Sequence, residues 1–158
     1  MRSAYNLARW LVRNGDDAED IVQEAFLKAF KAIDSFRGGD ARVWMLSIVR
    51  NTAMNFLRKR KPDVTMDLDQ LEPSDRSPNP EQALLEQSRR EQVRRAIARL
   101  EPEFREALVL REIEGLSYKE IAAVLEIPAG TVMSRLSRAR QRLLNELAPA
   151  EEVRHELP

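Results

Sequence analysis

Apolar residues recur at intervals of three and four along most of the chain, and this periodicity constrains the fold more than any other feature. Leu7 and Leu11 stand about one helical turn apart, and so do Val93 and Ile97. Glycine, which disfavours helix interiors, accounts for only 5 of the 158 residues. The sequence therefore predicts an all-α protein.

Three helices are expected in the first 61 residues. Asn14-Gly15 is expected to end the first, because glycine is common just past a helix end. Asp16 or Asp17 would then cap the second, and a loop signal follows that helix before the third begins. The third helix is expected to stop before Pro62. The periodicity places the three helices over residues 4–12, from about 16 to 36, and from about 41 to 61.

Residues 62–80 differ from the rest of the chain in composition. They contain four prolines and five acidic residues, and Arg76 is their only basic residue. Such a segment buries too little apolar surface to offset the entropy lost on ordering, so we expect a flexible linker. The linker divides the chain into two small helical domains, over residues 1–61 and 81–147, and the polar residues 148–158 are expected to form a disordered tail.

The second domain is expected to begin with two helices, over residues 81–100 and 103–112. Pro102 separates them, since proline disrupts a helix interior but suits its first turn. Gly115 is expected to end the second of these helices.

The segment from Leu116 to Leu144 has the pattern of a helix-turn-helix. Ser117 followed three residues later by Glu120 is a capping box, which marks the start of a helix. Pro128 stops that helix and sets the backbone for the next one. Glu126 stands at a turn position where a positive φ favours glycine. A residue other than glycine at such a position lowers stability by about 1 kcal/mol.

The second helix of this segment carries a basic face, although the formal net charge of the chain is zero. Between Ala129 and Leu147 there are four arginines and one acid, Glu146. Arginine can contact a guanine edge through two parallel hydrogen bonds, and serine or threonine can contact bases or phosphates. A charged face alone is typical of a solvated helical hairpin, but together with the capping box and the Ile-Pro turn it indicates DNA binding. The candidate residues are Thr131, Ser134, Arg135 and Arg138.

The third helix combines aromatic, amide and basic side chains, a mixture that suits single-stranded or melted nucleic acid. Trp44 taken alone is more typical of a packed core residue, and that alternative stays open. The acidic start of the preceding helix, from Asp16 to Glu24, is consistent with compensation of the helix dipole rather than with a metal site, because no histidine joins it. The candidate residues are Trp44, Arg50, Asn51, Arg58, Lys59, Arg60 and Lys61.

Several classes of protein are not indicated. Without cysteine the chain has no disulfide and no thiolate metal site. Its single histidine, His155, lies in the polar tail, and no phosphate-binding glycine loop is present, so we expect neither an enzyme nor a cofactor. No apolar run approaches the roughly 18 residues that a membrane span needs, so we expect a cytoplasmic protein without membrane insertion.

Both halves of the chain resemble bacterial sigma-70 family factors. Four segments resemble region two of that family: the run from Asp16 to Phe26, Phe36-Arg37-Gly38-Gly39, Trp44-Met45-Leu46 and Arg50-Asn51-Thr52-Ala53. The segment from Leu116 onward resembles region four. Two such regions joined by a short acidic linker resemble the extracytoplasmic-function (ECF) group, and the resemblance extends to about Leu147.

The resemblance implies a sigma factor that binds RNA polymerase core and directs promoter-specific initiation. Region two would capture the melted minus-ten element and region four would bind the minus-thirty-five element. The implied partners are promoter DNA, the clamp helices of the largest polymerase subunit, the flap, and an anti-sigma factor. A helix-turn-helix regulator that acts without polymerase docking is the alternative.

The resemblance also assigns roles to particular residues. Trp44 and Asn51 would face the minus-ten element, with Arg58 to Lys61 on backbone phosphates. Met133 replaces a cation that many relatives carry. The polymerase-binding residues would be Asp20, Gln23 and Glu24, and those at the minus-thirty-five element would be Ser134, Arg135, Arg138 and Arg140.

Family members usually have a further helix before the equivalent of Ala4, so the first domain is expected to be shortened at its N-terminus. Without that helix, the apolar face around Leu7 and Leu11 would be exposed.

Overall fold

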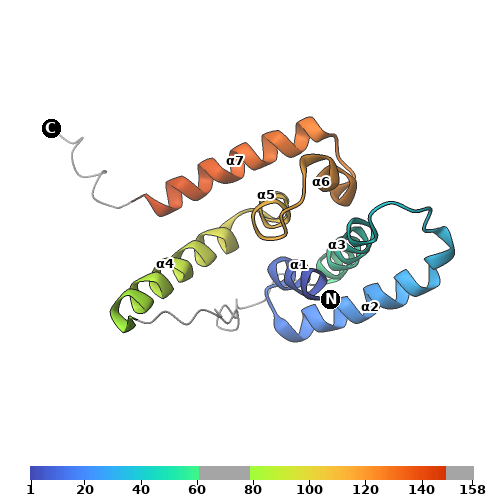
Figure 1. Cartoon of the computed structure of the whole chain (residues 1–158), viewed down its shortest axis with the longest axis horizontal. Helices are drawn as coiled ribbons and strands as arrows, with labels where there is room; N and C mark the ends of the chain where they lie inside the picture. The colour runs from blue at the N-terminus through green and yellow to red at the C-terminus, as the bar shows by residue number, and fades with distance from the viewer. Residues whose placement is uncertain (61–78, 149–158) are drawn as a thin grey trace.

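The computed structural model describes residues 1–60 and 79–148, and every regular element in these ranges is helical (Figure 1). The prediction of an all-α protein is confirmed. Lys61, nearly all of the predicted linker and the predicted tail from residue 149 lie outside the described residues. The elements are α1 (Arg2–Val12), α2 (Gly15–Lys31), the 3-10 turn η1 (Ile33–Ser35), α3 (Ala41–Lys59), α4 (Pro80–Arg99), α5 (Pro102–Leu108), the π-helical turn η2 (Val109–Ile113), α6 (Tyr118–Leu125) and α7 (Ala129–Leu147).

The junction between α1 and α2 differs from the prediction. Arg13 ends α1 in the left-handed conformation, with φ of 60°. Asn14 caps α2 by accepting a hydrogen bond from the backbone N–H of Asp17 at 3.0 Å. The prediction that Asp16 or Asp17 is the cap was wrong, because Asn14 is an equally good cap residue and comes first. The two aspartates therefore lie in the first turn of α2, where their negative charge interacts favourably with the helix dipole.

The end of α2 differs from the prediction, whereas the helix predicted over residues 103–112 is present as α5 and the η2 turn. α2 stops at Lys31, short of residue 36, and the η1 turn follows it. This turn lets Phe36 fold back onto Trp44, with ring centroids 5.0 Å apart. α5 continues into the wider η2 turn, and Gly115 then takes a φ of 69°. α4 begins at Pro80, the last residue of the predicted linker, with Asn79 as its cap.

The helix-turn-helix follows the predicted pattern in detail. The Ser117 hydroxyl accepts from the Glu120 backbone N–H at 3.1 Å, and the Ser117 backbone N–H donates to the Glu120 carboxylate at 2.7 Å. Glu126 takes the left-handed conformation with φ of 55°. Ile121 of α6 and Leu136 of α7 are fully buried in the hydrophobic cluster.

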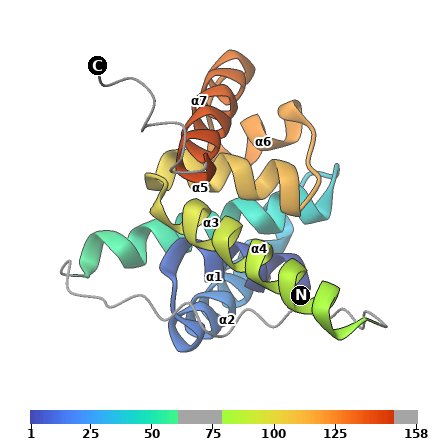
Figure 2. The same cartoon turned by 90° about the vertical axis from the view of Figure 1, so that its left-hand side faces the viewer.

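The two domains pack against each other. Helix α1 contacts α5, and α3 contacts α6. Figure 2 shows α5 between α7 on one side and α1 on the other. Buried residues of α1, α2 and α3 form one continuous hydrophobic cluster with those of α5, α6 and α7. Leu7 and Leu11 belong to this cluster, so the expectation that they would be exposed was wrong: α2, α3 and α5 cover them.

A buried arginine crosses the boundary between the domains. Arg105 of α5 donates to the backbone carbonyl of Leu100 at 2.7 Å and to that of Trp10 in α1 at 3.5 Å. Desolvation, together with the nearby positive charge of Arg13, lowers the pKa of Arg105 to about 10. Among the described residues, no helix is both long and apolar enough to cross a membrane.

Candidate nucleic-acid interface

The N-terminal half of α7 presents polar side chains to solvent. Ser134 and Arg138 are exposed, and Thr131 is half-buried. The Ser134 hydroxyl donates to the backbone carbonyl of Thr131, one helical turn earlier, at 3.0 Å. Met133 is 53% exposed beside them. The mixed polar character of this surface suits a helix that enters a DNA groove.

Two arginines further along α7 turn back towards the domain. Arg140 donates to Glu112 at 2.9 Å, and hydrogen bonds to Glu112 and Tyr118 raise the pKa of Arg140 above its usual value. Arg142 pairs with Glu101 and lies over the Phe104 ring, 4.6 Å from its centroid. Arg138, on the same helix, is exposed.

Trp44 of α3 lies in a cleft between the two domains. Its ring packs against Phe36, and both side chains are half-buried. The cleft has a volume of about 650 Å³, and its opposite wall is formed by Lys119 and Ala123 of α6. An aromatic side chain beside a cleft of this size offers a stacking platform for a base, although α6 narrows the approach.

Arg50 of α3 points at a carboxylate of the second domain. Its guanidinium donates two hydrogen bonds to Glu106 of α5, from Nε at 2.9 Å and from Nη2 at 3.0 Å. The Glu106 side chain is 1% exposed. Asn51, the neighbour of Arg50 in the sequence, accepts a further hydrogen bond from Arg50 Nη1 at 3.4 Å.

Arg135 of α7 approaches the same carboxylate. Its Nη1 lies 3.7 Å from Oε1 of Glu106. One residue of each predicted DNA-contacting set, Arg50 and Arg135, therefore converges on Glu106, which sequence reasoning missed. Charged residues occur on every side of α5, so periodicity alone does not distinguish Glu106 from its neighbours.

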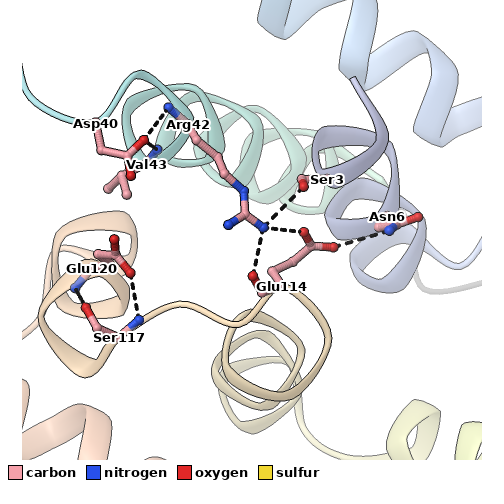
Figure 3. A network of polar contacts seen from close by, with 8 residues as sticks. All are labelled: Ser3, Asn6, Asp40, Arg42, Val43, Glu114, Ser117 and Glu120. Carbon is pink, nitrogen blue, oxygen red and sulfur yellow. Dashed lines mark hydrogen bonds and ion pairs between the residues drawn. The ribbon is translucent and has the colours of Figure 1, made fainter.

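A second cross-domain network lies at the start of α3 (Figure 3). Arg42 donates to the Glu114 carboxylate at 2.9 Å, to the Glu114 backbone carbonyl at 2.7 Å, and to the Ser3 hydroxyl at 3.3 Å. Asn6 of α1 donates to the other carboxylate oxygen of Glu114 at 3.2 Å. Sequence reasoning missed this network as well, because its members lie on three elements that are distant in sequence.

The C-terminal end of α3 carries an exposed basic group of Arg58, Lys59 and Arg60. Arg60 pairs with Asp17 of α2 and lies 5.5 Å from the centroid of the Phe56 ring. Arg58 and Lys59 therefore have the more accessible charges. Lys61, which was predicted to belong to this group, lies outside the described residues.

The outer face of α2 combines acidic and apolar side chains. Asp20, Gln23 and Glu24 are exposed, and Glu24 pairs with Lys28 at 2.8 Å. Phe30 beside them is 80% exposed, and Leu27 and Ile33 are also exposed. Sequence reasoning selected only the polar members; the apolar ones were indistinguishable from core residues without the helix packing. Exposed apolar side chains in such a group mark a surface that binds another protein.

Comparison with known families shows which class of protein carries these surfaces. Residues 1–62 match the family Sigma-70 region 2, and residues 90–143 match Sigma-70, region 4. The chain is 42% identical to the ECF RNA polymerase sigma-E factor of Escherichia coli K12, over 84% of this chain and 75% of that protein. It belongs to the sigma-70 family, in the extracytoplasmic-function group. The RNA polymerase sigma-H factor of Pseudomonas aeruginosa is 40% identical to this sigma factor, over 87% of this chain and 77% of its own length.

Solved structures agree with this assignment. The sigma factor RpoE of Bartonella quintana, in complex with the anti-sigma factor NepR, superposes with a TM-score of 0.74 at 29% identity, covering 92% of this sigma factor and 90% of that chain. CnrH in complex with the cytosolic domain of CnrY superposes with a TM-score of 0.66 at 28% identity, covering 92% and 80% of the two chains. Since regions two and four are both present, a helix-turn-helix regulator that acts without polymerase is not favoured.

Proposed function

We propose that this sigma factor binds RNA polymerase core through α2 and contacts promoter DNA with α3 and α7. The proposal rests on the presence of both sigma regions in one chain. Region two exposes acidic and apolar side chains on α2, which suit a protein partner, and region four exposes polar and basic side chains on α7, which suit DNA. The protein acts by binding alone: the free energy of holding a separated strand drives promoter opening, and no covalent step is required. It works in the cytoplasm, where the polymerase is.

The outer face of α2 is the proposed polymerase-binding surface. Asp20, Gln23 and Glu24 supply polar contacts, and the exposed Leu27 and Phe30 supply apolar area beside them. Tight protein interfaces combine a few large apolar side chains with a polar rim, and this face has that composition. The clamp helices of the largest subunit are the proposed partner, with the flap as a second contact.

Helix α3 is the proposed minus-ten reader. Trp44 offers a ring for stacking and Asn51 an amide for a base edge. Unstacking a base requires the least free energy where the strand is already opening, which favours capture of a melted element. Arg50, Arg58 and Lys59 are proposed to hold phosphates, because their charges lie along the same helix. Arg60 and Lys61, which follow them in the sequence, are proposed to have the same role.

Helix α7 is the proposed minus-thirty-five reader. The recognition helix of a helix-turn-helix places its N-terminal residues against base edges in the major groove. Thr131, Ser134, Arg135 and Arg138 are the corresponding residues here, and Arg140 is proposed to contact a phosphate once it leaves Glu112. The exposed Met133 offers apolar contact where many relatives offer a cation.

An anti-sigma factor is the proposed regulatory partner. Two similar sigma factors, RpoE of Bartonella quintana and CnrH, were solved in complex with NepR and with the cytosolic domain of CnrY. The same kind of partner would cover α2 or the DNA-facing helices and so prevent initiation.

The experiment combines purified bacterial core polymerase, the sigma factor and a random-sequence duplex library. We expect the holoenzyme to select DNA with two conserved blocks and to initiate transcription from it, whereas core alone does neither. A Phe30→Ser variant should lose core binding, and Leu85→Ser, which changes another exposed apolar residue, on α4, is the matched control. Failure of the wild-type chain to bind core would contradict the proposal.

A further inference from the structure

Met133 is a large apolar side chain on the otherwise polar surface of the first half of α7. It is 53% exposed, and the exposed residues that follow it there are Ser134, Ser137 and Arg138. We propose that Met133 contacts the C5-methyl group of a thymine in the minus-thirty-five element and so selects a T·A base pair at one position. This inference rests on the proposed function of α7 and names the base feature that the helix recognises.

The buried residues of α7 show which side of the helix faces away from the protein. Three of them are fully buried on one side: Val132, Leu136 and Ala139. Since each residue turns an α-helix by about 100°, Ser134 points almost directly away from that side. Met133 and Arg138 lie on the two flanks of Ser134, about 140° apart. The two flanks of the exposed surface therefore differ, one being apolar and the other basic.

The position of Met133 along α7 brings it close to bases. α7 begins at Ala129, so Met133 lies in the second turn, and the N-terminal residues of a recognition helix are those that contact base edges. Gly130, one turn earlier, has no side chain, and a Cβ built there would meet no heavy atom within 4 Å. The start of the helix can therefore approach DNA closely. Figure 1 shows α6 and α7 at the edge of the molecule opposite α2, where a duplex has access.

The chemistry of the thioether favours one base feature over the others. In the major groove the thymine methyl is apolar, whereas the other distinguishing groups are hydrogen-bond donors and acceptors. Methionine has no polar hydrogen to donate, and its sulfur is only a weak acceptor. A base donor or acceptor covered by Met133 would lose its water without gaining a partner, which is unfavourable. Contact with a methyl group removes apolar surface from water and is favourable.

The arginines of α7 leave a larger share of the base preference to this apolar contact. Arg135 lies 3.7 Å from the buried carboxylate of Glu106, and its own side chain is only 22% exposed. Arg140 donates to Glu112 at 2.9 Å. An arginine held by an acid of the protein gives up that partner before it contacts a guanine, which reduces the net gain. Met133 has no such competing partner to release, because its side chain is apolar.

Deoxyuridine substitution tests the methyl contact directly. The probe is the minus-thirty-five duplex that the wild-type holoenzyme selects, and each of its thymines is replaced in turn by deoxyuridine, which removes only the C5-methyl group. We expect one replacement to weaken binding of the wild-type holoenzyme about fourfold, the value for one buried methyl group. The same replacement should leave the affinity of the Met133→Ala holoenzyme unchanged. Fluorescence anisotropy supplies the four affinities of this double-mutant cycle.

Three further variants check the specificity of the effect. Leu144→Ala is the matched control, because Leu144 is another exposed apolar residue of α7, about three turns after Met133. It should retain the full effect of deoxyuridine. Met133→Leu keeps an apolar side chain and should retain most of it. Met133→Arg should change the base selected at that position from thymine to guanine, since arginine can donate two hydrogen bonds to a guanine edge.

The outcomes separate this inference from the proposed function. A deoxyuridine effect that persists in Met133→Ala would overturn the inference, and so would a selected duplex in which no thymine methyl affects wild-type binding. In both cases core binding and selection of two DNA blocks would still support the proposed function. A wild-type chain that neither binds core nor selects DNA would contradict the proposed function and this inference with it. Thermal melting of each variant shows that it is folded, as expected for an exposed position.

Discussion

Arg50 and Glu106 lie 56 residues apart in the sequence and form an ion pair with two hydrogen bonds, at 2.9 and 3.0 Å, across the boundary between regions two and four. The pair joins a predicted DNA contact to a buried acid of the other domain. Its geometry makes the packing of the two regions testable by stability as well as by DNA binding.

Arg50→Ala should lower the free energy of unfolding by about 2 kcal/mol, because it leaves the buried carboxylate of Glu106 with only the more distant Arg135. Urea denaturation monitored by circular dichroism gives the value. Arg58→Ala, an exposed substitution on the same helix, should change stability by less than about 0.5 kcal/mol. Equal losses in the two variants would show that the pair contributes nothing to the packing of the domains.

Ser117→Ala should lower the free energy of unfolding by about 1 kcal/mol, since it removes the side-chain acceptor of the capping box of α6. Ser137→Ala, at an exposed position inside α7, is the control and should be neutral or slightly stabilising. Chemical denaturation of both variants makes the comparison. A neutral Ser117→Ala would mean that water replaces the cap without loss.

Glu126→Gly should raise the free energy of unfolding by up to about 1 kcal/mol, because glycine accepts the φ of 55° at this turn without a steric penalty. Glu19→Gly, inside α2, should have the opposite effect, with a loss of about 1 kcal/mol. The signs are compared by thermal unfolding. Destabilisation by both substitutions would show that Glu126 is favoured by a contact stronger than its backbone strain.

Arg138→Ala should weaken binding to a duplex minus-thirty-five site selected by the holoenzyme, and should reduce the slope of log affinity against log salt by about one unit if the contact is to a phosphate. Arg142→Ala is the matched control, since Arg142 already pairs with Glu101 and stacks over Phe104. Fluorescence anisotropy across a salt series measures both effects. A larger effect of Arg142→Ala would assign the DNA contact to the wrong face of α7.

The proposed polymerase-binding surface shows how far sequence reasoning could go on a site. Asp20, Gln23 and Glu24 were selected through the family resemblance, and the structure places all three on one exposed face of α2. The apolar half of that face, including Phe30, was not selected. From sequence alone, an apolar residue in a helix is expected to lie in the core. Only the packing shows which side of the helix is covered.

The errors in helix ends had two causes, one local and one tertiary. Asn14, Asp16 and Asp17 are all good cap residues, and the chain uses the first of them. The early end of α2 follows from the turn that brings Phe36 onto Trp44, a contact that no local propensity encodes.

The sequence by itself determined the all-α fold, the family and the helix-turn-helix. Those features rest on spacings of three and four residues, on the reciprocal cap between Ser117 and Glu120, and on motifs read in order along the chain. Interactions between residues so close in sequence depend little on the remainder of the molecule.

Only the tertiary structure decided how the two regions sit together. It buried Leu7 and Leu11 in the hydrophobic cluster that the two regions share, and it brought Arg50 and Arg135 to one carboxylate. Such contacts join residues tens of positions apart, and their strength depends on whether water is excluded from the site. Burial of this kind is a property of packed helices, and no pattern within a single helix specifies it.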